Sequence, residues 1–181
     1  IAVKEEIRQQ TPSQDLFDKA LRAAMDKKYA IALEFIDSLL KISPTLIKAY
    51  NLKTSILINL ERLEEARSTS LEALKLEEWN LECAIFLGII DKITGNHDES
   101  LKHFRTAIYI QPTCWLAHFY LAEIQNSKGV AGEARKEYEI AIKLLETKGA
   151  EDKGVTYFPI SYSVEQLIHL CRHNIAGLAI G

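Results

Sequence analysis

Apolar and polar residues along most of the chain follow the spacing of amphipathic helices, and small residues among them recur at a fixed distance. Ala73, Ala107 and Ala141 lie 34 positions apart, and Leu87-Gly88 is followed one period later by Leu121-Ala122. A constant period of this length is typical of a repeat array in which each unit is a pair of helices. The pattern therefore predicts helix pairs stacked side by side.

Four copies of this period fit the chain, with bounds at 13–46, 47–80, 81–114 and 115–148. The third copy is the clearest, because Gly88 lets the two helices of the pair approach closely and Phe104 fills the gap beside it. Gly95 falls between those helices, where the first helix must end. The pattern resembles the tetratricopeptide repeat. We expect an all-α fold, a right-handed α-solenoid of about four such helix–turn–helix repeats plus a C-terminal capping helix.

The segments that flank the repeats have their own predicted roles. Residues 1–12 are expected to form a linker or a short N-terminal helix, and residues 149–162 a loop that crosses the last repeat. An array needs a terminal cap, because the last repeat cannot cover its own apolar face. Residues 163–174 are the predicted capping helix, and residues 175–181 a tail.

The predicted capping helix carries two helix signals. Ser163 and Gln166 have the spacing of a capping box, in which each side chain bonds a free backbone N–H at the helix start. Four apolar side chains then follow at i, i+3, i+4 and i+7, which places them on one face of the helix. These are Val164, Leu167, Ile168 and Cys171.

Composition and charge narrow the function classes. The chain is 48% apolar and 26% charged, as in soluble globular proteins, and its net charge of −3 disfavours nucleic-acid binding. No apolar run is long enough to span a bilayer, and no leader is present, so we expect no membrane insertion. Three cysteines without a Cys-x-x-Cys pair favour a cytoplasmic location. Because the chain begins at Ile1 without a methionine, we interpret it as part of a longer protein.

The residues that could carry chemistry do not form a convincing catalytic or metal site. His169 and His173 have metal-ligand spacing on the predicted capping helix, but no third ligand is evident. His118 has no visible nucleophile partner, and Cys114 lacks the cationic neighbours of a reactive thiol. We therefore expect no catalytic residue, metal or cofactor in this fragment and no enzymatic activity of its own.

The first helix of each repeat should line a concave face, which is where such arrays hold peptides. The face is expected to be apolar at its ends and polar in its middle, which suits an amphipathic helix or an extended segment. The alternative is that the N-terminal segment or a domain contact covers part of this face. The candidate partner-binding residues are Phe17, Leu21, Asn51, Ser55, Asn59, Ile85, Ile89, Phe119, Glu123 and Asn126.

One stretch carries a more specific resemblance. The run 107–122 contains Ala-Ile-Tyr-Ile-Gln-Pro and Leu-Ala-His-Phe-Tyr-Leu-Ala, and is followed by Glu-Ala-Arg at 133–135 and Leu-Leu-Glu at 144–146. This series is similar to the C-terminal tetratricopeptide extension of bacterial chemotaxis-receptor glutamate methyltransferases. Tyr109, His118 and Phe119, together with the terminal helix, discriminate this family from other repeats.

The resemblance implies a protein-interaction module that regulates or docks a methyltransferase. Its catalytic domain, with the S-adenosylmethionine site, would lie outside this chain, and no catalytic residue can be assigned here. The partner would be a chemoreceptor segment, a response regulator or the protein's own catalytic domain. The alternative function is a general scaffold for assembling a multiprotein complex, unrelated to methylation.

Overall fold

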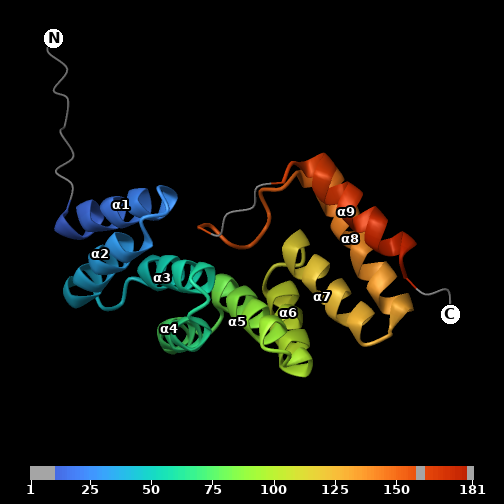
Figure 1. The fold of residues 1–181 in the computed structure, drawn as a ribbon, viewed down its shortest axis with the longest axis horizontal. Helices are drawn as coiled ribbons and strands as arrows, with labels where there is room; N and C mark the ends of the chain where they lie inside the picture. The colour runs from blue at the N-terminus through green and yellow to red at the C-terminus, as the bar shows by residue number, and fades with distance from the viewer. Residues whose placement is uncertain (1–10, 158–161, 179–181) are drawn as a thin grey trace, which may run out of the picture.

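The helices of this chain follow the sequence period closely. A computed structural model describes residues 11–157 and 162–178, and within these ranges the chain forms nine α-helices and no strand (Figure 1). The predicted all-α solenoid is thereby confirmed. The helices are α1 (Pro12–Met25), α2 (Tyr29–Ile42), α3 (Ile47–Asn59), α4 (Leu63–Leu76), α5 (Leu81–Ile93), α6 (His97–Ile110), α7 (Trp115–Ser127), α8 (Ala131–Lys148) and α9 (Val164–Ala176).

Consecutive helices pack in pairs, and the pairs stack. The most extensive contacts are those of α1 with α2, α3 with α4, α5 with α6 and α7 with α8. The first helix of each pair also contacts the first helix of the next pair, so α1, α3, α5 and α7 line one side of the array. We call this side the concave face. The last helix, α9, packs on α8 and ends the stack.

The turn inside each pair has the same backbone conformation in all four repeats. Its central residue has a positive φ, and this residue is Lys27, Glu61, Gly95 and Gly129 in turn. The next residue donates its N–H to the carbonyl five positions back, as Asn96 does to Asp91 at 2.8 Å. These are Schellman turns, which prefer glycine at the left-handed position. The turn is therefore encoded by position in the period even where glycine is absent.

Small residues allow the close helix approach that the pattern predicts. Ala73, Ala107 and Ala141 are completely buried. Gly88 lies under the ring of Phe104, and a Cβ at this position would meet that ring at 2.8 Å. Ser100 also donates its hydroxyl to the carbonyl of Gly88 at 2.7 Å. Helices α5 and α6 are thus held at a distance that larger side chains would prevent.

The terminal helix begins as the sequence predicts and ends slightly later. The capping box of Ser163 and Gln166 is confirmed, since both of its hydrogen bonds are formed. Leu167 and Cys171 are buried against α8, and the amide of Asn174 donates to the Tyr138 hydroxyl at 3.1 Å. Helix α9 continues to Ala176, and Leu178 beyond it is buried. Most of the predicted linker, residues 1–10, and the tail residues 179–181 lie outside the described residues.

Candidate functional site

The concave face is occupied by the chain's own residues. Residues 149–157, which we call the strap, leave the end of α8 and run back over α7, α5 and α3 towards α1 (Figure 1). The sequence predicts a loop here that crosses the last repeat. The strap reaches side chains from all four repeats, so part of the face that would receive a partner is covered.

At the C-terminal end of the array, the strap is held through its main-chain carbonyls. The indole Nε1 of Trp115 donates to the carbonyl of Ala150 at 3.1 Å. The thiol of Cys114 donates to the carbonyl of Lys153, also at 3.1 Å. Burial raises the pKa of this thiol to about 11. Cys114 is therefore a buried, protonated donor and not a reactive thiolate.

Gly154 makes the closest approach between the strap and the helices. A Cβ at this position would lie 2.6 Å from Cδ1 of Ile85 and 2.7 Å from Sγ of Cys114. The residue also has a φ of +78°, which other residues rarely adopt. Its neighbour Val155 is only 3% exposed. This part of the strap therefore fits the face only because residue 154 lacks a side chain.

In the middle of the face, the strap contacts a half-buried carboxylate. The hydroxyl of Thr156 donates to Oε1 of Glu82 on α5 at 2.7 Å. Burial raises the pKa of the Glu82 carboxyl, and the hydrogen bond from Thr156 opposes that shift. Because a carboxylate that loses water needs a donor, Thr156 replaces part of the hydration that the strap removes.

At the N-terminal end of the array, Tyr157 is the anchor. The hydroxyl of Ser55 on α3 donates to the carbonyl of Tyr157 at 3.2 Å. The ring of Tyr157 meets Phe17 of α1 edge-on, with 5.6 Å between centroids, a favourable aromatic geometry. Burial, and to a lesser extent the charge of Glu82, raises the pKa of the Tyr157 phenol. The strap thus ends on the first repeat.

The strap leaves two hollows beside it. One, of about 890 Å³, lies between the strap and the loop that joins α4 to α5, and is lined by Glu77, Trp79, Glu82 and Gln111 among others. Trp79 is 58% exposed and contacts the ring of Tyr109, which is 77% exposed. The second hollow, of about 140 Å³, lies between α1, α3 and Tyr157.

The ten candidate partner-binding residues divide by burial. Phe17, Asn51, Ser55, Ile85, Ile89 and Phe119 are buried, Leu21 and Glu123 are half-buried, and Asn59 and Asn126 are exposed. Of these, Phe17, Ser55 and Ile85 meet the strap directly. Sequence reasoning names these contacts on the helix side but misses all strap residues. The signal that could have found them is the series Gly154-Val155-Thr156-Tyr157, in which a glycine precedes a β-branched and an aromatic residue within the predicted loop.

The fold has clear relatives among known repeats. The tetratricopeptide repeat family profile matches residues 47–78, which contain α3 and α4. The crystal structure of a MamA protein covers 93% of this chain and 96% of its own length, with a TM-score of 0.65 and 15% identity. The fold is a tetratricopeptide-repeat solenoid. This result confirms the repeat resemblance seen in the sequence.

Other tetratricopeptide-repeat structures give the same result. TTC0263, a thermophilic protein of Thermus thermophilus, has a TM-score of 0.67 at 19% identity over 76% of both chains. The OM64 domain of Arabidopsis has a TM-score of 0.60 at 17% identity and covers 62% of this chain and 93% of its own. At such identities the likeness concerns the fold alone. No curated protein sequence matches the chain.

His118 has a structural position within the fourth tetratricopeptide repeat. It is buried on α7, where Nδ1 lies 2.6 Å from Oε2 of Glu137 and Nε2 lies 3.0 Å from the carbonyl of Pro112. Both ring nitrogens therefore face oxygen acceptors. The side chain joins α7 to α8 and to the turn that precedes the repeat. These contacts use both of its nitrogens and leave neither open to a substrate.

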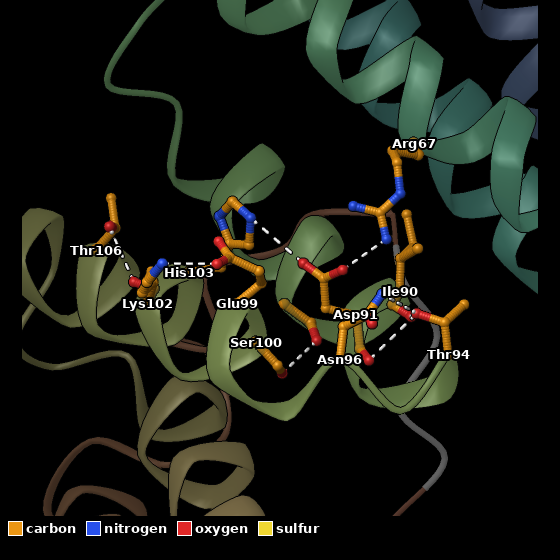
Figure 2. Close-up of polar contacts among 11 residues, drawn as sticks. Arg67, Ile90, Asp91, Thr94, Asn96, Glu99, Ser100, Lys102, His103 and Thr106 are labelled. Carbon is orange, nitrogen blue, oxygen red and sulfur yellow. Dashed lines mark hydrogen bonds and ion pairs between the residues drawn. The ribbon is translucent and has the colours of Figure 1, made fainter.

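A second buried polar cluster links neighbouring tetratricopeptide repeats. Figure 2 shows the carboxylate of Asp91 on α5 between Arg67 of α4 and His103 of α6. The guanidinium Nη2 of Arg67 lies 2.6 Å from Oδ1, and Nε2 of His103 lies 3.4 Å from Oδ2. Burial lowers the pKa of His103, although the Asp91 charge opposes this. The cluster ties the second repeat to the third.

The remaining candidates are the paired histidines of the terminal helix. Within residues 11–157 and 162–178, no three His, Cys, Asp or Glu side chains could hold a metal ion together. His169 and His173 are exposed on α9 beside Glu165 and line a surface hollow of about 570 Å³. Among the described residues, no helix is both long and apolar enough to cross a membrane.

Proposed function

We propose that this chain is a protein-interaction module that holds an extended partner segment on its concave face. The observation that carries the proposal is the mode of contact with the strap. Side chains of the array donate hydrogen bonds to three main-chain carbonyls, those of Ala150, Lys153 and Tyr157. Recognition through the main chain suits extended segments of many sequences, and the curved face of a repeat array is a common site for it.

Selection from a display library of short random peptides tests this function. Peptides that bind a chain whose residues 150–157 are replaced by Gly and Ser should bind more weakly when Trp115→Phe and Ser55→Ala are added, which removes two donors and keeps the helices. Each lost hydrogen bond should cost about 0.5–1.5 kcal/mol of binding free energy, measured by calorimetry. Thr106→Ala on the exposed side of α6 is the matched control. Selected peptides whose binding free energy changes with Thr106→Ala but not with the double substitution would contradict the proposal.

The finer proposal is that the chain is the regulatory or docking domain of a chemotaxis-type protein-glutamate methyltransferase. It is supported by Tyr109, His118 and Phe119 in the family's pattern and by a terminal helix after a loop. Tyr109 is largely exposed beside Trp79, so its ring is available to a partner. The catalytic domain would lie before Ile1, and its partner would be a chemoreceptor segment, a response regulator or that domain itself.

The coding sequence upstream of Ile1 tests this link at once. We expect a domain there that binds S-adenosylmethionine, and we expect removal of the present chain to change receptor methylation without abolishing methyl transfer. An unrelated upstream sequence would favour the second candidate, a general tetratricopeptide scaffold for complex assembly. The fold supports the methyltransferase link and the general scaffold equally, because the structural relatives share the repeat array and have only 15–19% sequence identity to this chain.

We further propose that the chain has no catalytic activity and needs no cofactor. Its three cysteines are buried and free, and burial raises the pKa of each thiol. His118 is engaged through both nitrogens. Calorimetry with S-adenosylmethionine is the direct check, and we expect no heat of binding. Saturable binding of this compound by the isolated chain would contradict the proposal.

A further inference from the structure

The strap contacts the array as a bound peptide would. It reaches all four repeats and bonds to side chains of α3 and α5 and to Cys114 and Trp115 at the start of α7. The one backbone hydrogen bond seen between described strap residues joins Lys153 to Glu151, so regular structure does not hold it in place. Its conformation is set by the face on which it lies.

Three strap positions select residue type. Residue 154 must be glycine, because a Cβ would collide with Ile85 and Cys114. Residue 155 is buried and β-branched, and residue 157 places an aromatic ring against Phe17. Glu151 is exposed and selects little, whereas Thr156 is exposed but donates its hydroxyl to Glu82. The face thus recognises a glycine, then a β-branched residue, then an aromatic residue three positions after the glycine.

The strap can leave without unfolding its supports. Helices α8 and α9, between which it is tethered, pack directly on each other through Leu145, Leu167 and the bond from Asn174 to Tyr138. Most strap residues remain partly or fully exposed while bound. Segments with few buried contacts open locally at a small fraction of the cost of global unfolding. Release of the strap would remove Val155 from the core and expose the face, and we expect the direct packing of α8 on α9 to keep the helix stack intact.

We propose that the strap is an internal occupant of the concave face and exchanges with a partner segment of the same chemistry. That segment carries Gly, a β-branched residue, a hydrogen-bond donor and an aromatic residue in this order. The inference rests on the proposed function, since it names the partner's sequence class and the regulation of the same site. A tethered occupant competes at an effective concentration on the order of millimolar. Only a partner that binds tightly or is locally concentrated therefore displaces the strap.

Cys114 reports the state of the strap. It is fully buried and donates to the strap at Lys153. Its thiol should become accessible to an alkylating reagent when the strap leaves. Cys171 is 1% exposed where α9 packs on α8, and it should stay protected in both states. The ratio of labelling at these two thiols, measured by peptide mass spectrometry, therefore separates strap release from general unfolding.

The test compares the full chain with a variant in which residues 150–157 are replaced by Gly and Ser at equal length. A blocked peptide with the sequence of residues 149–157 is the probe, and the same peptide with G154V is the matched control. We expect the replaced chain to keep its helical circular dichroism and to bind the probe at least tenfold more tightly than the full chain does. The control peptide should bind at least tenfold more weakly than the probe.

Labelling gives the second readout. Cys114 should react at least tenfold faster in the replaced chain than in the full chain, and the probe peptide, but not its G154V form, should restore protection. Equal Cys114 labelling in both chains would overturn the proposal. Loss of folded structure on replacement would also overturn it, because the strap would then be required for folding.

The two proposals fail in different ways. If library-selected peptides bind the concave face while the strap peptide does not, the exchange is refuted and the interaction function stands. If neither kind of peptide binds the replaced chain, both are refuted. A V155S/Y157A variant of the full chain repeats the comparison with the strap backbone kept, and should show intermediate Cys114 labelling.

Discussion

At the scale of single residues, the Asp91 cluster places a buried charge at the interface between two repeats. Its carboxylate is 2% exposed, and the Arg67 guanidinium is its nearest cation (Figure 2). A buried charge is tolerated only while its partners remain, since its lost hydration must be replaced. The cluster joins two repeats, so its loss would act on their interface and not on one helix.

Arg67→Ala should therefore destabilise the chain strongly. Removing one partner of a buried ion pair typically costs about 3–5 kcal/mol of unfolding free energy, and His103 at 3.4 Å can compensate only in part. Urea denaturation followed by circular dichroism measures the change. Lys102→Ala breaks an exposed pair with Glu99 on the same helix as His103 and is the control, for which we expect no measurable change. Equal effects of the two substitutions would refute this role for Asp91.

His103 should make stability depend on pH. Burial lowers its pKa in the folded chain below the ordinary value of 6.5, and the Asp91 charge only partly offsets this. The unfolded chain then binds the proton more tightly, so the stabilisation is present above pH 6.5 and is lost as the pH falls. We expect a smaller unfolding free energy at pH 5.5 than at pH 7.5. His103→Gln should reduce this difference, and an unchanged pH profile would contradict the assignment.

At the scale of elements, the turns inside the pairs show how much the period encodes. Glycine marks the left-handed position in repeats three and four, while Lys27 and Glu61 occupy it in repeats one and two with φ of 59° and 57°. Holding a residue with a side chain in this region costs about 1–2 kcal/mol. The first two repeats therefore retain strained turns that the last two avoid.

Substitutions at equivalent turns should therefore change the unfolding free energy in opposite directions. Glu61→Gly should raise the unfolding free energy by about 0.5–1 kcal/mol, since it relieves strain that exceeds the added freedom of the unfolded chain. Gly95→Ala should lower it by about 1 kcal/mol, although the space around Gly95 is open. Thermal unfolding compares both with the wild type. A destabilising Glu61→Gly would show that this side chain contributes more than its backbone costs.

Gly88 tests the packing between the helices of one pair. A Cβ there would lie 2.8 Å from the Phe104 ring, so Gly88→Ala should cost about 1–3 kcal/mol through overpacking. Gly132→Ala is the matched control, because nothing lies near its Cβ and alanine favours helix α8 by about 0.5–1 kcal/mol. Denaturant midpoints should therefore move in opposite directions. A neutral Gly88→Ala would indicate that Phe104 can shift at little cost.

At the scale of the whole molecule, the repeats were predictable and the strap was not. The period of Ala73, Ala107 and Ala141 reports contacts between residues close in sequence, which local pattern captures. The bond from Ser55 to Tyr157 joins residues 102 positions apart, and no periodic signal marks it. Ser55 and Ile85 could be placed on the concave face from helix geometry alone. The position of the strap over them depends on tertiary packing, which the sequence pattern alone does not show.

The buried core also divides unevenly along the array. One cluster spans the second to fourth repeats and α9, and a smaller one joins α1, α2 and the first part of α3. We expect amide hydrogens of α1 and α2 to exchange before those of α5, because terminal repeats have one neighbour only. Native-state hydrogen exchange with mass spectrometry measures this order. Simultaneous exchange of α1 and α5 would show that the array opens as one unit.

The contact of Tyr157 with Phe17 connects the two ends of this linear array directly. In an open array, stability spreads only from each repeat to the next, so a disturbance at one end decays along the stack. Here a segment from behind the fourth repeat rests on the first, and fraying of α1 removes a partner from the segment after α8. A structural change at either end of the array therefore alters contacts at the other end directly, without passing through the repeats between them.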